Sequence, residues 1–374
     1  MRSAASGGSG ESGIVLFLCG DVMTGRGIDQ VLPFPSDPEL HESYARSALE
    51  YVELAARANG AVSAPVSFEY VWGDALPELE RAAPDVRIIN LETSVTTSGA
   101  WQPKGINYRM HPRNVPCLTA AGIDCCVLAN NHVLDWGHAG LDETLTALRL
   151  ADLRTAGAGY GVDEAWAPAV LDSHAGRVLV FGFAVECSGV PAAWDAAEGL
   201  GVSFLPDTSG ATADRVVAHI GAHRRPGDVV VVSIHWGSNW GYRVPTTHSS
   251  FAHRLIASGA VDAIHGHSSH HPRGIEVFEG KPILYGCGDF VNDYEGISGH
   301  EAYRGDLVLM YFLELSAAGL TRLRMIPMQI RRFRLWRASV SDASWLRGTL
   351  DRESSVFGTR VGSAEDGALE VSWR

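Results

Sequence analysis

Residues 128–140 read LANNHVLDWGHAG and follow directly on the apolar run IDCCV at 123–127. Asn130, Asn131 and His132 therefore lie where a buried strand is expected to end in a loop. Open α/β sheets bind their ligands in the crevice beyond the carboxyl ends of the strands. Amide and imidazole groups at such a place raise the question whether other strands of the chain end in the same way.

The rest of the chain alternates between strand and helix patterns. Short apolar runs suited to buried strands lie at 14–20, 86–92, 123–129, 178–185 and 229–235. Helical patterns lie between them at about 39–58, 138–151, 211–223 and 248–258. This alternation predicts an α/β protein with largely buried sheets.

The C-terminal third of the chain has a different pattern. The runs LVLMYFLEL and LRMIPMQI flank the turn SAAGL, which predicts an antiparallel hairpin. A last helix is expected at about 341–350, followed by a frayed tail at SAEDGAL. We expect a flexible N-terminus at 1–13 and one main domain at 14–335. The helix and tail at 336–374 should pack on that same domain.

Several of the predicted strands end in groups that could bind a metal ion. Oxygen and nitrogen ligands without thiolate suit Mn, Fe, Zn or a similar divalent ion. Each group alone has a plainer explanation as a turn residue, a helix cap or a hydrogen-bonded histidine. Their convergence on one crevice favours a metal-centred site. The groups are Asp21, Asn90, Glu92, Asn130, Asn131, His132, His235, His265, His267, His270 and His271.

Composition narrows the class of protein. The formal charge of −13 argues against nucleic acid as the main partner, although a local basic pocket could still bind a small anion. Six cysteines without a CxxC pair fit a reduced intracellular protein. No run of about 18 apolar residues is present, and the N-terminus lacks an apolar signal region. We therefore expect a cytoplasmic protein with no membrane partner. A homo-oligomer is left open.

The ordered motifs GDVM, NLE, LANNHVLDWG, HWG, GHSSH, GIEV and ILYGCGDF resemble those of the CapA family. That family is named for poly-γ-glutamate capsule biosynthesis and belongs to the calcineurin-like metallophosphoesterase superfamily. The resemblance runs from about residue 14 to about residue 330. It implies a four-layer α/β/β/α sandwich with the active site at the carboxyl ends of the strands. It also implies a divalent metal cofactor, with one or two ions per chain.

The resemblance implies a ligand set. One ion would be held by Glu92, Asn131, His235 and His267, and the other by Asp21, Glu92 and His270. Glu92 stands in place of a bridging aspartate.

The first motif of the superfamily is Asp-x-His, and Met23 stands at its histidine position. A thioether is a poor ligand for such ions, so we expect occupancy nearer one than two. His265 and His271 are spare candidates that more readily serve to orient the ligands.

The resemblance also implies that His132 acts on the substrate rather than on the metal. His132 could donate a proton to the leaving group or stabilise developing charge. Asp135 could fix its tautomer by accepting a ring N–H, and a helix N-cap is an equal alternative for Asp135.

Substrate-binding candidates are four arginines near the predicted rim, because guanidinium groups suit carboxylates and phosphates. Arg273 is the strongest of them, since it lies two residues after the histidine cluster. Solvated surface arginines are the alternative. The others are Arg26, Arg109 and Arg243.

Three function classes remain. The leading one is a metal-dependent hydrolase that acts on an anionic phosphoester or on an amide of a glutamyl substrate. The second is an amide or acyl transferase in poly-γ-glutamate or related small-molecule biosynthesis. The third is a non-enzymatic, polyanion-binding component of an assembly system. One scaffold hosts many chemistries, so the fold alone does not choose among them.

Overall fold

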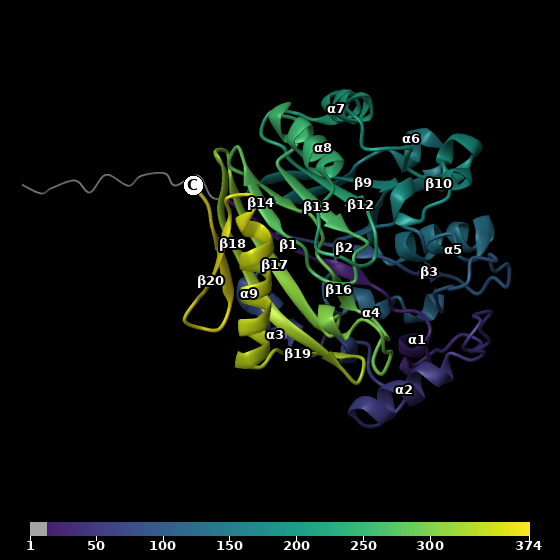
Figure 1. The fold of residues 1–374 in the computed structure, drawn as a ribbon. Helices are drawn as coiled ribbons and strands as arrows, with labels where there is room; N and C mark the ends of the chain where they lie inside the picture. Colours follow the sequence, from purple (N-terminus) through teal and green to yellow (C-terminus); the bar gives the residue numbers. More distant parts are fainter. Residues whose placement is uncertain (1–12) are drawn as a thin grey trace, which may run out of the picture.

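The computed structural model describes residues 13–374, so the expected flexible segment at 1–13 lies, apart from Gly13, outside the described residues. The protein is a mixed α/β structure built on two large sheets (Figure 1). Within residues 13–374 the larger sheet has ten strands. In spatial order these are β20 (Arg360–Ser363), β21 (Leu369–Ser372), β18 (Gly319–Arg331), β17 (Leu307–Ser316), β1 (Ile14–Val22), β2 (Val86–Leu91), β5 (Cys125–Val127) and β6 (Arg154–Ala156), with β16 (Asp289–Val291) beside β1 and β19 (Arg334–Arg337) beside β18.

The second sheet has seven strands in the described part of the chain. Its central strands β9, β12 and β13 run parallel. The order is β11 (Phe204–Leu205), β9 (Gly176–Val185), β12 (Val229–His235), β13 (Ala263–His267), β15 (Lys281–Leu284) and β14 (Ile275–Phe278), with β8 (Ala169–Ser173) beside β9. Two small ribbons pair β7 (Ala158–Tyr160) with β10 (Leu200–Val202), and β3 (Ser94–Val95) with β4 (Arg109–Met110).

The helices surround the two sheets. They are α1 (Gly27–Val31), α2 (Leu49–Asn59), α3 (Ala75–Ala82), α4 (Pro116–Thr119), α5 (Gly137–Leu150), α6 (Val162–Ala165), α7 (Gly210–His223), α8 (Thr246–Ala257) and α9 (Val340–Ser355). In Figure 1, α7 and α8 lie together over β9, β12 and β13.

Three hydrophobic clusters explain this arrangement. The first joins α1 to α5 with the larger sheet, and the third joins α7 and α8 with the second sheet. The remaining cluster contains side chains from both sheets, such as Leu16 and Ile88 from one and Val180 and Val231 from the other. The two sheets therefore share a buried apolar layer. Because side chains alternate along a strand, each central strand contributes to two of these clusters.

The strands predicted at 14–20, 86–92, 123–129, 178–185 and 229–235 are confirmed as β1, β2, β5, β9 and β12. The helical patterns at 138–151, 211–223 and 248–258 are confirmed as α5, α7 and α8, and the predicted hairpin is β17–β18.

The helix predicted at 39–58 is wrong in its first half, because α2 begins only at Leu49. Residues 39–48 form a loop in which Glu39 bridges to Ser47 and the buried Glu42 pairs with Arg26. That buried ion pair outweighs the helix propensity of the segment.

The predicted C-terminal helix is present as α9, but the frayed tail is wrong. β20 and β21 form a hairpin, and β21 pairs with β18, so the end of the chain extends the larger sheet. SAEDGAL supplies the turn, closed by a backbone bond from Ala364 N–H to Ala368 C=O at 2.8 Å. The hairpin buries Val361 and Leu369. So few apolar residues give no clear strand pattern, and the hairpin could not be predicted from the sequence.

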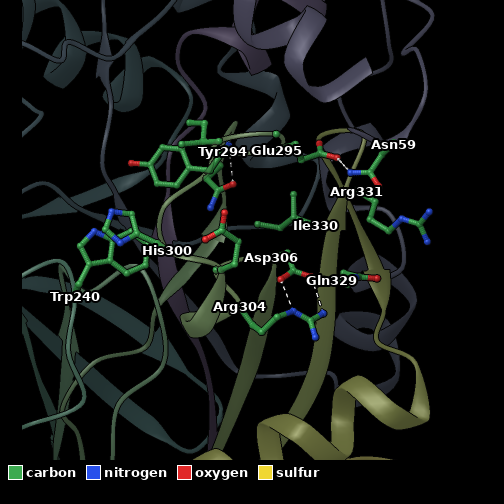
Figure 2. A pocket seen from close by; sticks show the side chains of 15 residues that line it. Asn59, Trp240, Tyr294, Glu295, His300, Arg304, Asp306, Gln329, Ile330 and Arg331 are labelled. Atoms are coloured by element: carbon green, nitrogen blue, oxygen red, sulfur yellow. Dashed lines mark hydrogen bonds and ion pairs between the residues drawn. The ribbon is translucent and has the colours of Figure 1, made fainter. Parts of the chain in front are cut away.

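A cavity of about 360 Å³ opens where β18 meets the segment after β16 (Figure 2). Trp240 and His300 form one wall, where their rings stack with centroids 3.9 Å apart. Ile330 lies toward the other side, beyond an ion pair between Arg304 and Asp306. Tyr294 lines the same cavity, and its ring lies edge-on to that of His270.

Candidate metal centre

The carboxyl ends of parallel strands from both sheets meet at one place. Asp21 lies near the end of β1, and Glu92 directly follows β2 in the same sheet. His235 and His267 are the last residues of β12 and β13, where they are paired in register. This is the location that the polar strand ends in the sequence predicted.

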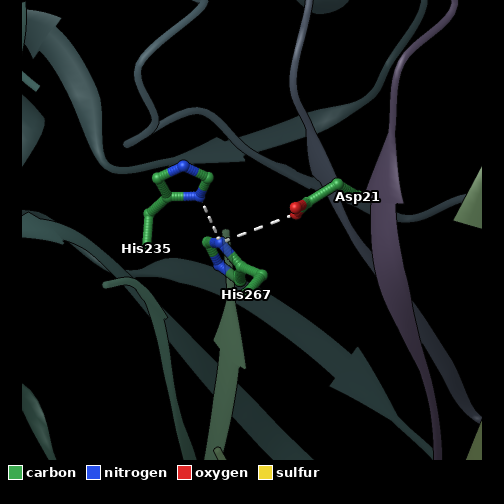
Figure 3. A group of neighbouring side chains, drawn as sticks. All are labelled: Asp21, His235 and His267. Carbon is green, nitrogen blue, oxygen red and sulfur yellow. Dashed lines mark hydrogen bonds and ion pairs between the residues drawn. The ribbon is translucent and has the colours of Figure 1, made fainter. Parts of the chain in front are cut away.

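Asp21, His235 and His267 form a compact buried group (Figure 3). The Nδ1 atoms of His235 and His267 are 2.8 Å apart, and Nδ1 of His267 is 3.8 Å from Oδ1 of Asp21. One ligand atom from each residue lies within 4.8 Å of the others. Two imidazoles and a carboxylate form a donor set that suits a borderline divalent ion.

Glu92 and Asn131 extend this group. Oε1 of Glu92 is 4.0 Å from Nε2 of His235, and Oδ1 of Asn131 is 3.0 Å from the same nitrogen. Oε2 of Glu92 is buried and has no hydrogen-bond partner among the described residues. A buried carboxylate oxygen without a partner is costly, and a cation would satisfy it.

The raised pKa values of Asp21 and Glu92 also favour a bound cation. Burial, followed by the nearby Asp289, raises the pKa of Asp21 to about 7. Burial and the neighbouring Asp21 raise the pKa of Glu92 well above its usual range. Burial and mutual repulsion thus disfavour two negative charges at this place, and a bound divalent ion would offset that repulsion. The residues present therefore fit the metal that the strand-end pattern predicted.

A hydrogen-bond chain from β1 sets the tautomer of His267. Nε2 of His265 lies 2.6 Å from the Cys19 carbonyl, which can only accept, so this nitrogen carries the proton. Burial lowers the pKa of His265 to about 4, so the ring is neutral and its Nδ1 accepts from the Ser233 hydroxyl at 3.0 Å. The Ser233 oxygen then accepts from Nε2 of His267 at 2.9 Å. Nδ1 of His267 therefore carries the lone pair, which faces His235 and Asp21.

Ser233→Ala should therefore weaken metal binding by about tenfold, because metal-ligand orienting partners contribute about 10–100-fold. The tautomer of His267 would no longer be fixed, although all ligand atoms would remain. Titration of the apo protein with Zn²⁺ or Mn²⁺ would measure the change in Kd. Ser249→Ala on α8, whose hydroxyl bonds Thr246 C=O, is a matched control and should leave Kd unchanged. Equal metal affinity in wild type and Ser233→Ala would contradict the proposed role of this hydrogen-bond chain in orienting His267.

His270 lies at the edge of the group rather than within it. Its Nδ1 bonds Oδ1 of Asp289 at 2.9 Å, and its Nε2 lies 3.0 Å from the Asn239 side-chain nitrogen. Burial acts to lower the pKa of His270, but the Asp289 carboxylate raises it above its usual value. His271 turns away and bonds Gly241 N–H. The ligand role of His270 stays a prediction.

His132 and Asp135 form a buried pair beside the group of Asp21, His235 and His267, which is called the metal group below. Nδ1 of His132 is 2.7 Å from Oδ2 of Asp135, which also accepts from Tyr108 N–H at 2.6 Å. Asp135 is not a cap for α5, whose N-cap is Trp136 and has no side-chain cap bond. Nε2 of His132 faces Glu92, with 3.7 Å to its Oε1. Burial lowers the pKa of His132 to about 4 despite the Asp135 carboxylate.

Lys104 is a residue beside this site that the sequence did not reveal. Its Nζ donates to Oδ1 of Asp135 at 2.7 Å and to the backbone carbonyl of Asn131. It therefore joins the His132–Asp135 pair to the asparagine beside the metal group. Lys104 lies in a loop about thirty residues before Asp135, and a lone loop lysine carries no pattern that marks it.

The four candidate arginines are placed differently from one another, and none of their hydrogen bonds among the described residues reaches Asp21, His235 or His267. Arg26 is buried and paired with Asp293 and Glu42. Arg273 is buried and donates to Ser238 C=O at 2.6 Å. Arg109 lies over Trp136, with its guanidinium carbon 4.0 Å from the ring centroid, and Arg243 is exposed. Their roles in substrate binding stay predictions.

Comparison with known proteins identifies relatives over most of the chain. The family model described as "Bacterial capsule synthesis protein PGA_cap" matches residues 15–294. A probable polyglutamine synthesis accessory protein of Mycobacterium tuberculosis is 49% identical over 364 residues, which cover 96% of each chain. The PGA biosynthesis protein CapA of Bacillus subtilis is 25% identical over 355 residues, 94% of this chain and 80% of that protein.

Among residues 13–374, no helix combines the length and the apolar character needed to span a membrane. The family match extends over most of the chain and includes the strand ends that supply Asp21, Glu92, Asn131, His235 and His267. The chain therefore belongs to the PGA_cap family of bacterial capsule synthesis proteins.

Proposed function

We propose that the protein is a metal-dependent hydrolase of an anionic phosphoester or of a glutamyl amide. The observation that carries this proposal is the buried group of Asp21, His235 and His267, with the unpartnered Oε2 of Glu92 beside it. We further propose that the two sheets and their outer helices form the four-layer sandwich of the calcineurin-like metallophosphoesterases. Three clusters of buried side chains in succession support that assignment.

The residues that would hold the ion are Asp21, Glu92, Asn131, His235 and His267, with His270 a further candidate at the edge. A divalent ion bound there would supply Lewis-acid activation of water and polarise the bond under attack. The chain itself supplies the rest of the site. Strand ends and short loops fix each ligand, and burial excludes bulk water.

His132 is proposed to act on the substrate. Its Nδ1 is bound to Asp135, so Nε2 is the atom that faces the metal group and can exchange a proton with the substrate. Asp135 holds the ring orientation and stabilises the protonated form. Lys104 fixes Asp135 in turn and adds positive charge at the side of the site where an anionic substrate would enter.

A non-enzymatic role is the second candidate. One specific observation favours it, namely that the relative 49% identical to this chain is described as an accessory protein of polyglutamine synthesis. In that case the same polar centre would bind a polyanion such as poly-γ-glutamate without cleaving it. Amide or acyl transfer to a glutamyl acceptor is a third candidate that uses the same residues.

The test is metal analysis of protein purified without chelator, followed by a turnover screen. The screen would include phosphomonoesters, phosphodiesters and γ-glutamyl amides, each with and without an amine acceptor. We expect turnover that EDTA abolishes and added divalent ion restores. Acceptor-dependent products would indicate transfer. Binding of poly-γ-glutamate without any metal-dependent turnover would contradict the hydrolase and favour the accessory role.

A further inference from the structure

Tyr294, three residues after β16, has a hydroxyl with an unusually weak acceptor. The hydroxyl donates to the Met23 thioether, with 3.8 Å between Oη and Sδ. It accepts a hydrogen bond from the Tyr108 hydroxyl at 2.9 Å, so its own proton is the one directed at sulfur. A thioether is a weak acceptor, and a hydroxyl in the interior normally finds an oxygen or nitrogen. The Tyr294 proton is therefore available to a better acceptor.

The two tyrosine rings bridge the two histidines on either side of the metal group. Tyr294 is edge-on to His270, with ring centroids 5.2 Å apart, and Tyr108 is edge-on to His132 at 4.5 Å. The backbone of Tyr108 is fixed by Asp135, which also orients His132. The two hydroxyl groups thus lie between His132, which is proposed to act on the substrate, and His270 at the edge of the metal group.

Arg26 packs against the rings of both tyrosines. Its guanidinium carbon lies 4.5 Å from the Tyr108 ring centroid and 5.7 Å from that of Tyr294. Asp293, the residue before Tyr294, binds the guanidinium through both carboxylate oxygens, at 3.1 Å and 2.5 Å. Arg26 has a positive φ of 48°, a conformation that non-glycine residues adopt only where the surroundings impose it. Arg26 therefore packs against both tyrosine rings while Asp293 holds its guanidinium.

The Tyr294 hydroxyl remains a proton donor at working pH. Burial, and after it the Asp289 carboxylate, raises the pKa of Tyr294 well above its usual range. Arg26 acts in the opposite direction and polarises the hydroxyl. Tyr294 also lines the cavity of about 360 Å³ shown in Figure 2.

We propose that Tyr294 is a catalytic residue whose hydroxyl donates a hydrogen bond to an anionic oxygen of the substrate. This contact would lie on the side of the site occupied by Met23, whose side chain offers no polar group. The catalytic role of Tyr294 rests on the proposed function, whereas its binding of an oxyanion does not depend on it. The ligand class is an oxyanion, a phosphoryl or carboxylate group. No covalent bond changes at Tyr294, and the proton stays on its oxygen.

The test compares Tyr294→Phe with wild type in the binding of inorganic phosphate to the metal-loaded protein by calorimetry. We expect a Kd weaker by about 10–100-fold, as for loss of one hydrogen bond to a charged group, with metal content unchanged. Any turnover found should fall by about 10²–10³ in kcat. Tyr303→Phe is the matched control, because Tyr303 also lies against a histidine of the loop, with its ring stacked on His271 and the centroids 4.6 Å apart.

Tyr108→Phe separates the two hydroxyls, because it leaves the donor on Tyr294 and should weaken phosphate binding less. Equal phosphate affinity in Tyr294→Phe and wild type would overturn the inference, as would a wild type that binds no phosphate. A larger effect of Tyr108→Phe than of Tyr294→Phe would also overturn it. Weakened binding in Tyr294→Phe upholds the inference even if no hydrolysis is found, and in that case only the proposed function fails.

Discussion

His132→Ala should lower the rate of hydrolysis by about 10²–10⁴, the usual contribution of a positioned acid or base. Its imidazole is oriented by the Asp135 carboxylate, with 2.7 Å between Nδ1 of His132 and Oδ2 of Asp135. Its free Nε2 faces the side of Glu92, where the substrate would be bound. The metal content should not change, because the short hydrogen bond of the His132 ring goes to Asp135 and its distance to the nearest proposed ligand, Glu92, is 3.7 Å. Steady-state kinetics and metal analysis of the same preparation would measure both quantities.

Asp135→Asn is the companion variant. It keeps the shape of the side chain but removes the charge that orients His132, so kcat should fall while KM changes little. Lys104→Met tests the next link, since Lys104 holds the other oxygen of Asp135. His248→Ala is a control, because His248 is a buried histidine of α8 that stacks on Trp236, with ring centroids 4.6 Å apart. Loss of metal in His132→Ala would show that His132 is a ligand rather than a group that acts on substrate.

The polar ends of the strands could be predicted because strand position and residue type are both local properties. An apolar run that ends in Asp21, Asn131 or His235 indicates a buried strand and places a polar side chain at its carboxyl end. The parallel topology then brings such ends together without further information. The strands β1, β2, β5, β9 and β12 followed from that reasoning, as did the expectation that their polar ends meet in one crevice. The grouping of Asp21 with His235 and His267 did not, because the ligand set implied by the resemblance assigned Asp21 to one ion and the two histidines to the other.

The partners of these residues could not be predicted, because they come from distant segments. Arg26 was expected at the rim, yet Glu42 and Asp293 draw it into the interior. Ser233 and Lys104 are ordinary residues in the sequence, and their roles depend on the atoms that lie next to them in the fold. The helix predicted at 39–58 failed for the same reason, since a tertiary ion pair at Glu42 overrides local propensity.

His235→Ala and His267→Ala should each reduce bound metal by more than half in protein purified without chelator. Each variant removes one imidazole from a group in which the two Nδ1 atoms are 2.8 Å apart and Nδ1 of His267 is 3.8 Å from Asp21. Protons would compete with the ion for the remaining Asp21 carboxylate, because burial raises the pKa of Asp21 to about 7. Elemental analysis per chain would measure the loss. We expect wild-type occupancy nearer one ion than two, because Met23 supplies no ligand for a second.

The same variants should lose the stabilisation that metal gives. An ion that binds only the folded state adds about 2.7 kcal/mol at a free concentration of 100 times Kd, so EDTA should lower the Tm of wild type but not of His267→Ala. His248→Ala again serves as the control for loss of a buried imidazole, and its Tm should remain sensitive to EDTA. Wild-type metal content in both His235→Ala and His267→Ala would show that the ligands are misassigned. Two tightly bound ions in wild type would instead mean that another group replaces the histidine absent at Met23, and His270, held by Asp289 at 2.9 Å, would be the first residue to test.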